Sequence, residues 1–402
     1  MGHTRCYLGA PLDFHFTPEQ EAYRATVGAW LDAELPDWCA PGFADDADEA
    51  TRFERQRSWH RKLYEAGYVG ATWPVEHGGR ELDPVCNAIL QEELARAEAP
   101  PALNPLGIGL CGPAILHHGS EAQKRRYLPP MLRAEELWCQ GYSEPGAGSD
   151  LAGLSTRAEL EDDHYRVNGQ KTWTSLAAQA DWCFALVRTD PSRPRHDGIG
   201  FLLIDMRSPG IEVRPITQIT GEREFGEVFF SDVRVPAENL VGAPTEGWRI
   251  ANTVLGYERG ANTLSLYARF QKRFERLAEL GRERTGPSAA VLRERLAQIA
   301  IEVEILRLNS LRQLSLLARG EAPGPETSIQ KLYWSELENR FHRLAVDLQG
   351  PYGQLVAGSE RAVDGGIWQF EELNARRFMI ARGTSEIQRN IIAERVLGLP
   401  RR

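Results

Sequence analysis

The sequence lacks the motifs of two large classes of hydrolase. It contains no Gly-x-Ser-x-Gly segment and no His-Glu-x-x-His segment, so neither a serine nucleophile on a sharp turn nor a helical zinc site is indicated. The adjacent residues His117 and His118 cannot share one face of a helix. These absences argue against Ser-His-Asp chemistry and against zinc-dependent hydrolysis.

Cysteines and long apolar runs are also scarce. The 402 residues include six scattered cysteines and no Cys-x-x-Cys pair, so we expect reduced thiols and no disulfide framework. No run of about 18 apolar residues occurs, so no transmembrane helix is predicted. Residues 1–16 contain no charged segment followed by an apolar one, which argues against a signal peptide. We therefore expect a cytoplasmic location.

Positive charge is in deficit. The chain has 47 Lys and Arg against 56 Asp and Glu, which gives a formal net charge of −9. A general nucleic-acid binder needs an excess of cations to neutralise phosphates, so we predict no nucleic-acid partner. Hydrophobic residues make up 42% and charged residues 26% of the chain, which is typical of a soluble globular protein. The length predicts two or three domains.

The periodicity of apolar residues divides the chain into three parts. Residues 1–136 carry helical patterns, residues 137–245 alternate as strands do, and residues 246–402 are helical again. Thr17 followed by Pro18 is a helix start. The further helices expected in the first part are 45–67, 84–99 and 120–132, and breaks between long helices are expected at 281–288 and 320–325.

The middle part contains several strand candidates separated by turn residues. Tyr165 to Thr174 predicts a hairpin with a tight turn at Asn168-Gly169. The other predicted strands are 181–188, 199–206, 211–216 and 227–235. The sequence alone thus predicts a β-domain between two helical domains.

One Gly-rich segment matches a dinucleotide-binding fingerprint by spacing only. Residues 107–112 read Gly-Ile-Gly-Leu-Cys-Gly, but the fingerprint requires a preceding strand and a following helix within a βαβ unit. Prolines at positions 100, 101 and 105 precede it in a helical region. We interpret the segment as small residues that allow close helix packing.

The segment Tyr142 to Asp150 is the most informative one. Its sequence, Tyr-Ser-Glu-Pro-Gly-Ala-Gly-Ser-Asp, has two interpretations. It is either a polar turn entering the β-domain or a loop whose backbone N–H groups and hydroxyls face a polar ligand. Trp173, further on, is either ordinary strand core or the wall of a site for a planar ring.

Four segments, in this order, closely resemble the acyl-CoA dehydrogenase family. They are residues 143–150 (Ser-Glu-Pro-Gly-Ala-Gly-Ser-Asp), 168–175 (Asn-Gly-Gln-Lys-Thr-Trp-Thr-Ser), 229–242 (beginning Phe-Phe-Ser-Asp-Val-Arg-Val-Pro) and 383–395 (beginning Gly-Thr-Ser-Glu-Ile-Gln-Arg). The resemblance runs from about residue 13 to the C-terminus. These long, ordered motifs are specific for the family and much less so for a substrate.

The resemblance implies a fold, a cofactor and partners. The implied fold is α+β, with an N-terminal helical domain (1–136), a middle β-domain of barrel or sandwich type (137–245) and a C-terminal four-helix bundle (246–402). The implied cofactor is FAD, held partly across a subunit interface in a homotetramer or homodimer. The implied substrate is an acyl-CoA, and the implied electron acceptor is an electron-transfer flavoprotein.

The family's cofactor contacts can be carried over residue by residue. The positions of this sequence that match them are Gln140, Ser143, Gly148, Ser149, Trp173, Ser175, Gly350, Gly353, Thr384 and Glu386. The family's usual Arg-x-x-Phe-Gly segment, which reaches the FAD of a neighbouring subunit, has no clear match within residues 279–290. Arg282 and Arg284 are the cations nearby, and Asp347 stands where a Gln is common.

The identity of the catalytic base follows from the resemblance and one departure from it. A carboxylate must take the weakly acidic proton α to the thioester, and donors to the carbonyl stabilise the developing enolate. Many members place this Glu directly before the Gly-Thr of the last segment, but here Arg382 stands there and stays protonated. A branch resembling isovaleryl and long-chain enzymes carries it in a Glu-Arg pair that Glu258-Arg259 matches. We predict Glu258 as the base; an exposed helix Glu paired with an Arg is the alternative.

Arg382 itself has three interpretations. Its side chain could point at Glu258 and lower the pKa of that carboxylate, line the acyl pocket and favour a carboxylate or polar tail, or turn to solvent or an acidic neighbour. Its backbone N–H is a candidate donor to the thioester carbonyl. The full set of predicted substrate residues is Ser149, Tyr257, Arg259, Arg382 and Gly383.

Three competing functions remain at this stage. One is a related flavoprotein oxidase or monooxygenase, and another is a dehydrogenase of carrier-bound acyl groups in a biosynthetic pathway. The third is an inactive partner subunit of a mixed assembly or a nucleic-acid-associated relative. Glu258 argues against inactivity, and the acidic balance argues against nucleic acid.

Overall fold

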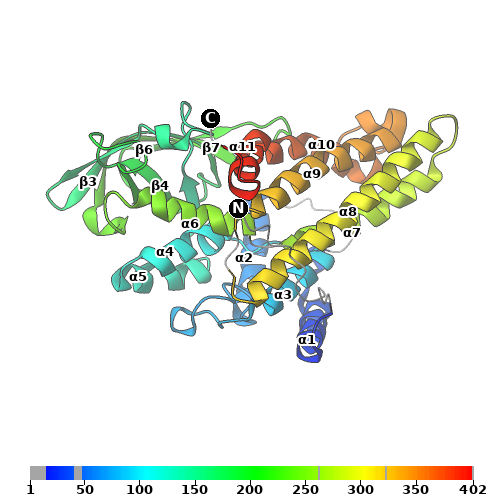
Figure 1. Ribbon diagram of the computed structural model, residues 1–402, viewed down its shortest axis with the longest axis horizontal. Coiled ribbons are helices and arrows are strands. Elements are labelled where there is room, and N and C mark those ends of the chain that lie inside the picture. Colours follow the sequence, from blue (N-terminus) through cyan, green and yellow to red (C-terminus); the bar gives the residue numbers. More distant parts are fainter. Residues whose placement is uncertain (1–14, 40–47, 261–262, 322–323, 401–402) are drawn as a thin grey trace, which may run out of the picture.

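The computed structural model describes residues 15–39, 48–260, 263–321 and 324–400. Figure 1 shows the strands at one end of the molecule and the long helices α7 and α8 reaching toward the other. Helices come first, strands second and helices again third. The predicted three-part fold class is therefore confirmed.

The first part of the chain is helical and its helices begin at residues that cap them. Thr17 and Ser120 each accept from the backbone N–H three residues on, while the Gln there accepts in return from the backbone N–H of the cap. Such reciprocal caps satisfy two helix-end N–H groups. The helices are α1 (Pro18–Glu34), α2 (Glu49–Glu65), α3 (Pro84–Arg96), α4 (Gly112–His118) and α5 (Glu121–Leu132).

The segment with the dinucleotide-type spacing forms no phosphate-binding loop. It is a π-helical stretch, Gly107–Cys111, that leads directly into α4, and helix α3 is the element before it. A Cβ on Gly112 would lie 2.2 Å from the Trp73 ring. Gly112 thus permits close packing against Trp73, which agrees with our interpretation of these small residues.

The middle part is one sheet. Its strands are β1 (Trp138–Gly141), β2 (Arg157–Glu161), β3 (His164–Ser175), β4 (Trp182–Arg188), β5 (Ile199–Asp205), β6 (Ile211–Ile216), β7 (Phe225–Pro236) and β8 (Leu240–Val241). Their order is β6-β7-β3-β2-β4-β5-β8, and β1 pairs in parallel with β4. The sheet therefore brings β1, which leads into the 143–150 segment, close to β3, which contains the 168–175 segment.

The predicted hairpin at Asn168-Gly169 is wrong. Strand β3 continues through both residues and pairs with β7, with a bulge between Val167 and Gly169. The actual turn joins β2 to β3 between Glu161 and His164. Asn-Gly favours a tight turn locally, but pairing with β7 holds Gly169 in the strand with φ +151°, where it packs closely against Thr156.

The third part is helical. Its helices are α6 (Gly247–Gly260), α7 (Thr263–Glu283), α8 (Ala289–Ala318), α9 (Thr327–Gln349), α10 (Ile367–Asn374) and α11 (Ser385–Ile391). The predicted breaks lie where α7 gives way to α8 and α8 to α9. None of the described helices is long and apolar enough to span a membrane.

The apolar core connects the three parts. One buried cluster runs from Trp59 and Met131 of the N-terminal helices through Trp138 and Phe184 of the sheet to Ile250 of α6. A second cluster fills the other face of the sheet, and a third lies between α7, α8 and α9. Burial of these faces fixes the sheet against the helices and so positions the site between them.

Candidate functional site

A buried ion pair holds the loop that follows β1. The Nζ of Lys171, in β3, donates to Glu144 Oε1 at 2.8 Å and to the carbonyl of Tyr142 at 3.1 Å. The other contacts of the Glu144 carboxylate are the backbone N–H groups of Ser155 and Thr156 and the Ser155 hydroxyl. Both charged side chains are almost fully buried.

This environment keeps Glu144 ionised. Burial alone would raise the pKa of Glu144, but Lys171 and the donated hydrogen bonds outweigh it and lower that pKa to about 2. Burial also lowers the pKa of Lys171, and Glu144 opposes that shift. The pair ties the loop after β1 to β3, the strand that carries Trp173.

Trp173 is displayed by a bulge in β3. The register with β7 shifts between Lys171 and Thr174, and Trp173 has φ +57°. A bulge re-aims a side chain, and the Trp173 side chain is 59% exposed with its ring edge against Phe225, 6.1 Å between centroids. The Thr172 N–H donates to the Ser143 carbonyl at 2.9 Å, so Trp173 and the Ser143 loop are held together.

This surface fits a planar, hydrogen-bonding ring such as a flavin. The buried Gln140 Nε2 and Thr174 Oγ1 have no hydrogen-bond partner among the described residues. Gly146 and Gly148 have open space where a side chain would stand. Exposed aromatic surface, together with unsatisfied polar atoms on β1 and β3, favours a bound ligand there. Ser149 is exposed and Ser175 is half-buried on the same strand and loop.

Two buried side chains, Lys331 and Gln388, hold the turn before α11 through hydrogen bonds to its carbonyls. The Nζ of Lys331 donates to the carbonyls of Phe378 and Gly383 at 2.9 and 2.8 Å. The Gln388 amide donates to the carbonyl of Arg382 at 2.9 Å. Arg382 and Gly383 both have positive φ, 61° and 87°. This conformation is unstrained for a glycine but strained for Arg382, so the shape of the turn depends on these donors.

Thr384 caps the helix that follows this turn. Its hydroxyl accepts from the N–H of Ile387 at 3.2 Å, and Glu386 lies exposed in the first turn of α11. A helix N-terminus favours a negative charge. The pKa of Glu386 is lowered, first by hydrogen bonds from its own backbone N–H and from Thr384.

An ion pair between domains connects the two halves of the site. Arg377 pairs with Glu224, which precedes β7, at 2.6 Å. Its guanidinium also lies near the rings of Phe225 and Phe378, at 5.8 and 5.1 Å. Since Phe225 contacts Trp173, Arg377 joins the Trp173 surface to the segment that carries Arg382.

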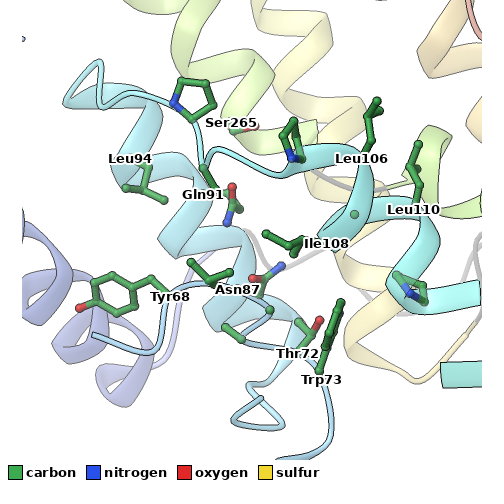
Figure 2. A pocket seen from close by; sticks show the side chains of 18 of the residues that line it. Tyr68, Thr72, Trp73, Asn87, Gln91, Leu94, Leu106, Ile108, Leu110 and Ser265 are labelled. Atoms are coloured by element: carbon green, nitrogen blue, oxygen red, sulfur yellow. The ribbon is translucent and has the colours of Figure 1, made fainter. Parts of the chain in front are cut away.

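A cavity of about 1090 Å³ adjoins this junction. Its lining includes Arg377, Phe378 and Arg382 from the C-terminal part and residues of α3, of the 68–77 segment and of α7. Figure 2 shows side chains of α3, including Asn87 and Gln91, together with Ile108 around this space. The arrangement suits a substrate that lies between the helical parts and reaches the Trp173 surface.

The structure does not bring all predicted site residues together. Gly350 and Gly353 lie in a turn at the end of α9, with the Arg284 guanidinium over Gly350. Lys331, which holds the Arg382 turn, lies near the start of α9, so about 27 Å of helix separates the two groups at 1.5 Å per residue. Within one chain they form separate sites.

The predicted base lies in α6, but its side chain falls outside the described part. The backbone of residues 257–259 belongs to α6 (Gly247–Gly260), and the side chains of Tyr257, Glu258 and Arg259 are not among those described. The roles of these three residues stay predictions. The same holds for the cofactor and substrate roles of the other predicted residues.

Sequence reasoning missed the residues that support the site from behind. Lys171 and Gln388 lie within recognisable motifs and Lys331 does not, but each acts through a buried contact with another segment or turn of the chain. A lysine inside a strand-like or helical apolar pattern is the available signal, because a fully buried lysine needs a partner. The partner itself is not visible in the sequence.

Comparison with known proteins agrees with this architecture. The family models "Acyl-CoA dehydrogenase, N-terminal domain", "middle domain" and "C-terminal domain" match residues 17–135, 139–233 and 245–397. The chain is 42% identical over 383 residues to acyl-CoA dehydrogenase IpdE1 of Mycobacterium tuberculosis, covering 95% of this chain and 98% of that protein. It is 38% identical to acyl-CoA dehydrogenase FadE34 of the same organism, covering 84% of this chain but 46% of FadE34.

Solved structures give the same result. The Tcur3481-Tcur3483 steroid ACAD superposes with a TM-score of 0.83 at 29% identity, over 97% of this chain and 100% of the other. The ChsE4-ChsE5 complex from Mycobacterium tuberculosis gives 0.83 at 28% identity over the same shares. Fold and sequence therefore identify an oxidoreductase built from helical, β and helical parts. The chain belongs to the acyl-CoA dehydrogenase family, which is FAD-dependent.

Proposed function

We propose that the protein is an FAD-dependent acyl-CoA dehydrogenase that converts an acyl-CoA to the trans-2-enoyl-CoA. The observation that carries this proposal is the junction at Arg377, which joins the exposed Trp173 surface to the Arg382–Gly383 turn beside a large cavity. A ring on Trp173 and an acyl thioester in the cavity would then meet at that turn. An electron-transfer flavoprotein is the expected acceptor, and the cytoplasm the expected compartment.

The residues of this chain supply binding and proton transfer. Gln140, Ser143, Gly148, Ser149, Trp173 and Ser175 would hold the flavin ring, and Thr384 and Glu386 lie where the resemblance implies contact with the pyrophosphate and ribose. When bound, FAD supplies the acceptor for the hydride that leaves the β-carbon. Glu258 removes the α-proton, and the backbone N–H of Arg382 donates to the thioester carbonyl, which stabilises the developing enolate.

The turn at residues 350–353, which follows α9, would contact a second subunit. It lies far along α9 from the Arg382 turn of its own chain, so we propose that it contacts FAD held mainly by a neighbouring subunit in a homotetramer or homodimer. A mixed assembly is the second candidate, because one structural relative, ChsE4-ChsE5, is a complex of two differently named proteins. FadE34, of which this chain covers only 46%, is a much longer relative.

The test replaces Glu258 by Gln in the holoenzyme. Loss of a general base costs about 10²- to 10⁴-fold in rate, so Glu258→Gln should abolish most flavin bleaching by acyl-CoA under anaerobic conditions while the flavin absorbance remains. Glu294→Gln, which removes an exposed carboxylate of α8, is the matched control and should behave as wild type. The panel should include linear, branched and steroid-derived acyl-CoAs. Near-normal bleaching by Glu258→Gln would overturn the assignment of the base.

A further inference from the structure

The cavity has polar donors at a place that the proposed chemistry does not use. Asn87 and Gln91 stand four residues apart on α3, so they share one face of that helix. Both line the cavity, and Figure 2 shows their amides directed into the same space as Ile108. Both side chains are half-buried, and the described residues give neither amide a hydrogen bond.

Arg269 adds a cation to this lining. It projects from α7, which packs against α3, and it lines the same cavity as Ser265 one turn before it. No described residue forms a hydrogen bond or ion pair with Arg269. Its side chain is exposed to the cavity, yet desolvation by the surrounding protein lowers the pKa of its guanidinium, and the charge of Glu338 opposes that shift. The carboxylate of Glu338 is already bonded to His342 Nε2 at 2.9 Å.

The other charged groups of the lining, Arg382 included, already have their own contacts. Lys331 binds two backbone carbonyls, Arg377 pairs with Glu224, and Lys124 pairs with Glu121 at 2.9 Å. Glu76, another carboxylate of the lining, lies 3.6 Å from His77 Nε2. Asn87, Gln91 and Arg269, here called the amide–guanidinium cluster, therefore remain as donors for a ligand.

We propose that the acyl group of the substrate carries an acceptor oxygen remote from the thioester, a carboxylate or a ketone, which the amide–guanidinium cluster binds. The proposal rests on the proposed function and names the substrate class of the same site. The two amides are half-buried and the Arg269 guanidinium is exposed to the cavity, so an acyl group that fills the cavity withdraws these donors from water. Donors without a partner are then costly, and an oxygen acceptor removes that cost. A plain alkyl chain would instead leave the amides and the guanidinium unsatisfied against methylene groups.

A different occupant of the same donors would be a phosphate of the CoA itself. Guanidinium groups bind phosphate as readily as carboxylate. The two cases differ in one respect: CoA phosphates are common to every acyl-CoA, whereas an acyl oxygen is not. The decisive measurement is therefore how strongly the enzyme distinguishes between acyl groups, and not only how tightly it binds an acyl-CoA.

The experiment measures kcat/KM of the holoenzyme with three matched substrates. They are octanoyl-CoA, its terminal-ketone analogue and its terminal-carboxylate analogue. Wild type should prefer an oxygenated analogue over octanoyl-CoA by about 10- to 100-fold, the range expected for a hydrogen bond to a desolvated donor. A preference for the carboxylate analogue would show that the bound oxygen belongs to an anionic group. A preference for the ketone analogue would show that it belongs to a neutral one.

The variants Arg269→Met and Gln91→Met test which groups confer the preference. Each should lower kcat/KM for the oxygenated substrate about tenfold or more and leave octanoyl-CoA unchanged or improved. Lys272→Met, three residues further along α7 and exposed, is the matched control and should keep the wild-type preference. Flavin absorbance and the melting temperature of each variant show that the fold is retained.

Three outcomes would overturn the inference. Equal losses with all three substrates would assign Arg269 to CoA binding, and a wild-type preference for octanoyl-CoA would show that the cluster is not a substrate site. Retention of the full preference in both Met variants would exclude these residues. Each leaves the dehydrogenase function intact, whereas a failure of every acyl-CoA to bleach the flavin would overturn the proposed function and the inference with it.

Discussion

Single residues decide how the flavin-type loop is held. Lys171 and Glu144 form a buried ion pair whose carboxylate oxygens also satisfy two backbone N–H groups. Removal of one partner from a buried pair leaves an uncompensated charge, which costs about 3–5 kcal/mol. Replacement of both partners by apolar groups often costs less. The pair therefore sets the position of the loop after β1 more than it adds to net stability.

We predict that Lys171→Met lowers the free energy of unfolding by about 3–5 kcal/mol. The measurement is urea unfolding of the apoprotein and the holoprotein followed by circular dichroism. The double variant Lys171→Met with Glu144→Leu should be less destabilised than the sum of its two single variants, because no charge is then left unpaired. Additive losses would show that the two side chains are not coupled.

The same pair predicts a dependence of stability on acid. The pKa of Glu144 is lowered from 4.5 to about 2 in the folded state, so the unfolded state binds its proton first as the pH falls. The stabilisation is complete above about pH 4.5 and is lost as the pH falls to about 2, on the order of 3 kcal/mol in total. Urea unfolding at several pH values should show a smaller acid loss in Glu144→Gln than in wild type. Equal acid losses in both proteins would contradict the low pKa.

At the scale of elements, β3 is shaped by its neighbours and not by its own sequence. Gly169 has φ +151°, and a Cβ there would lie 2.6 Å from Thr156. We predict that Gly169→Ala destabilises the protein by about 1–3 kcal/mol, because both the backbone conformation and the contact become unfavourable. Gly28→Ala in α1 is the control, since nothing lies within 4 Å of its Cβ position, and a helix favours Ala.

Thermal unfolding of these two alanine variants checks the prediction. Gly28→Ala should be neutral or stabilised by up to about 1 kcal/mol, while Gly169→Ala should melt at a lower temperature than wild type. A Gly169→Ala protein as stable as wild type would show that the bulge can move and that the Asn168-Gly169 segment keeps some of its local preference for a turn.

How much the sequence predicted depends on the range of the interactions involved. The caps Thr17 and Ser120 are local, since each cap and its Gln partner stand three residues apart, and the structure has the helices they predict. The turn at Asn168-Gly169 is local too, but tertiary pairing with β7 overrides it. The motifs around Ser143 and Trp173 could be found from sequence alone. The placement of Asn87, Gln91 and Arg269 around one cavity could not, because it depends on how α3 packs on α7.

At the scale of the whole molecule, the site lies where the β-domain meets the C-terminal helical part. Arg377 belongs to the C-terminal part and Glu224 to the β-domain, and their ion pair is only about one-third exposed on either side chain. A partly solvated pair adds little to global stability, typically below about 1 kcal/mol. Glu224 of this pair directly precedes Phe225, which contacts Trp173. The pair therefore influences the surface around Trp173 more than the stability of the fold.

We therefore predict that Arg377→Met weakens FAD binding by about 5- to 10-fold with little change in melting temperature. The reason is that Phe225, which contacts Trp173, loses the cation beside its ring. Flavin fluorescence during dialysis against increasing salt measures the retained FAD, and wild type should approach the variant at high salt as the pair is screened. Arg207→Met, which breaks an exposed Arg–Asp pair elsewhere on the β-domain, should retain FAD as wild type does. Equal retention by Arg377→Met and wild type at low salt would mean that the surface around Trp173 is fixed within the β-domain alone.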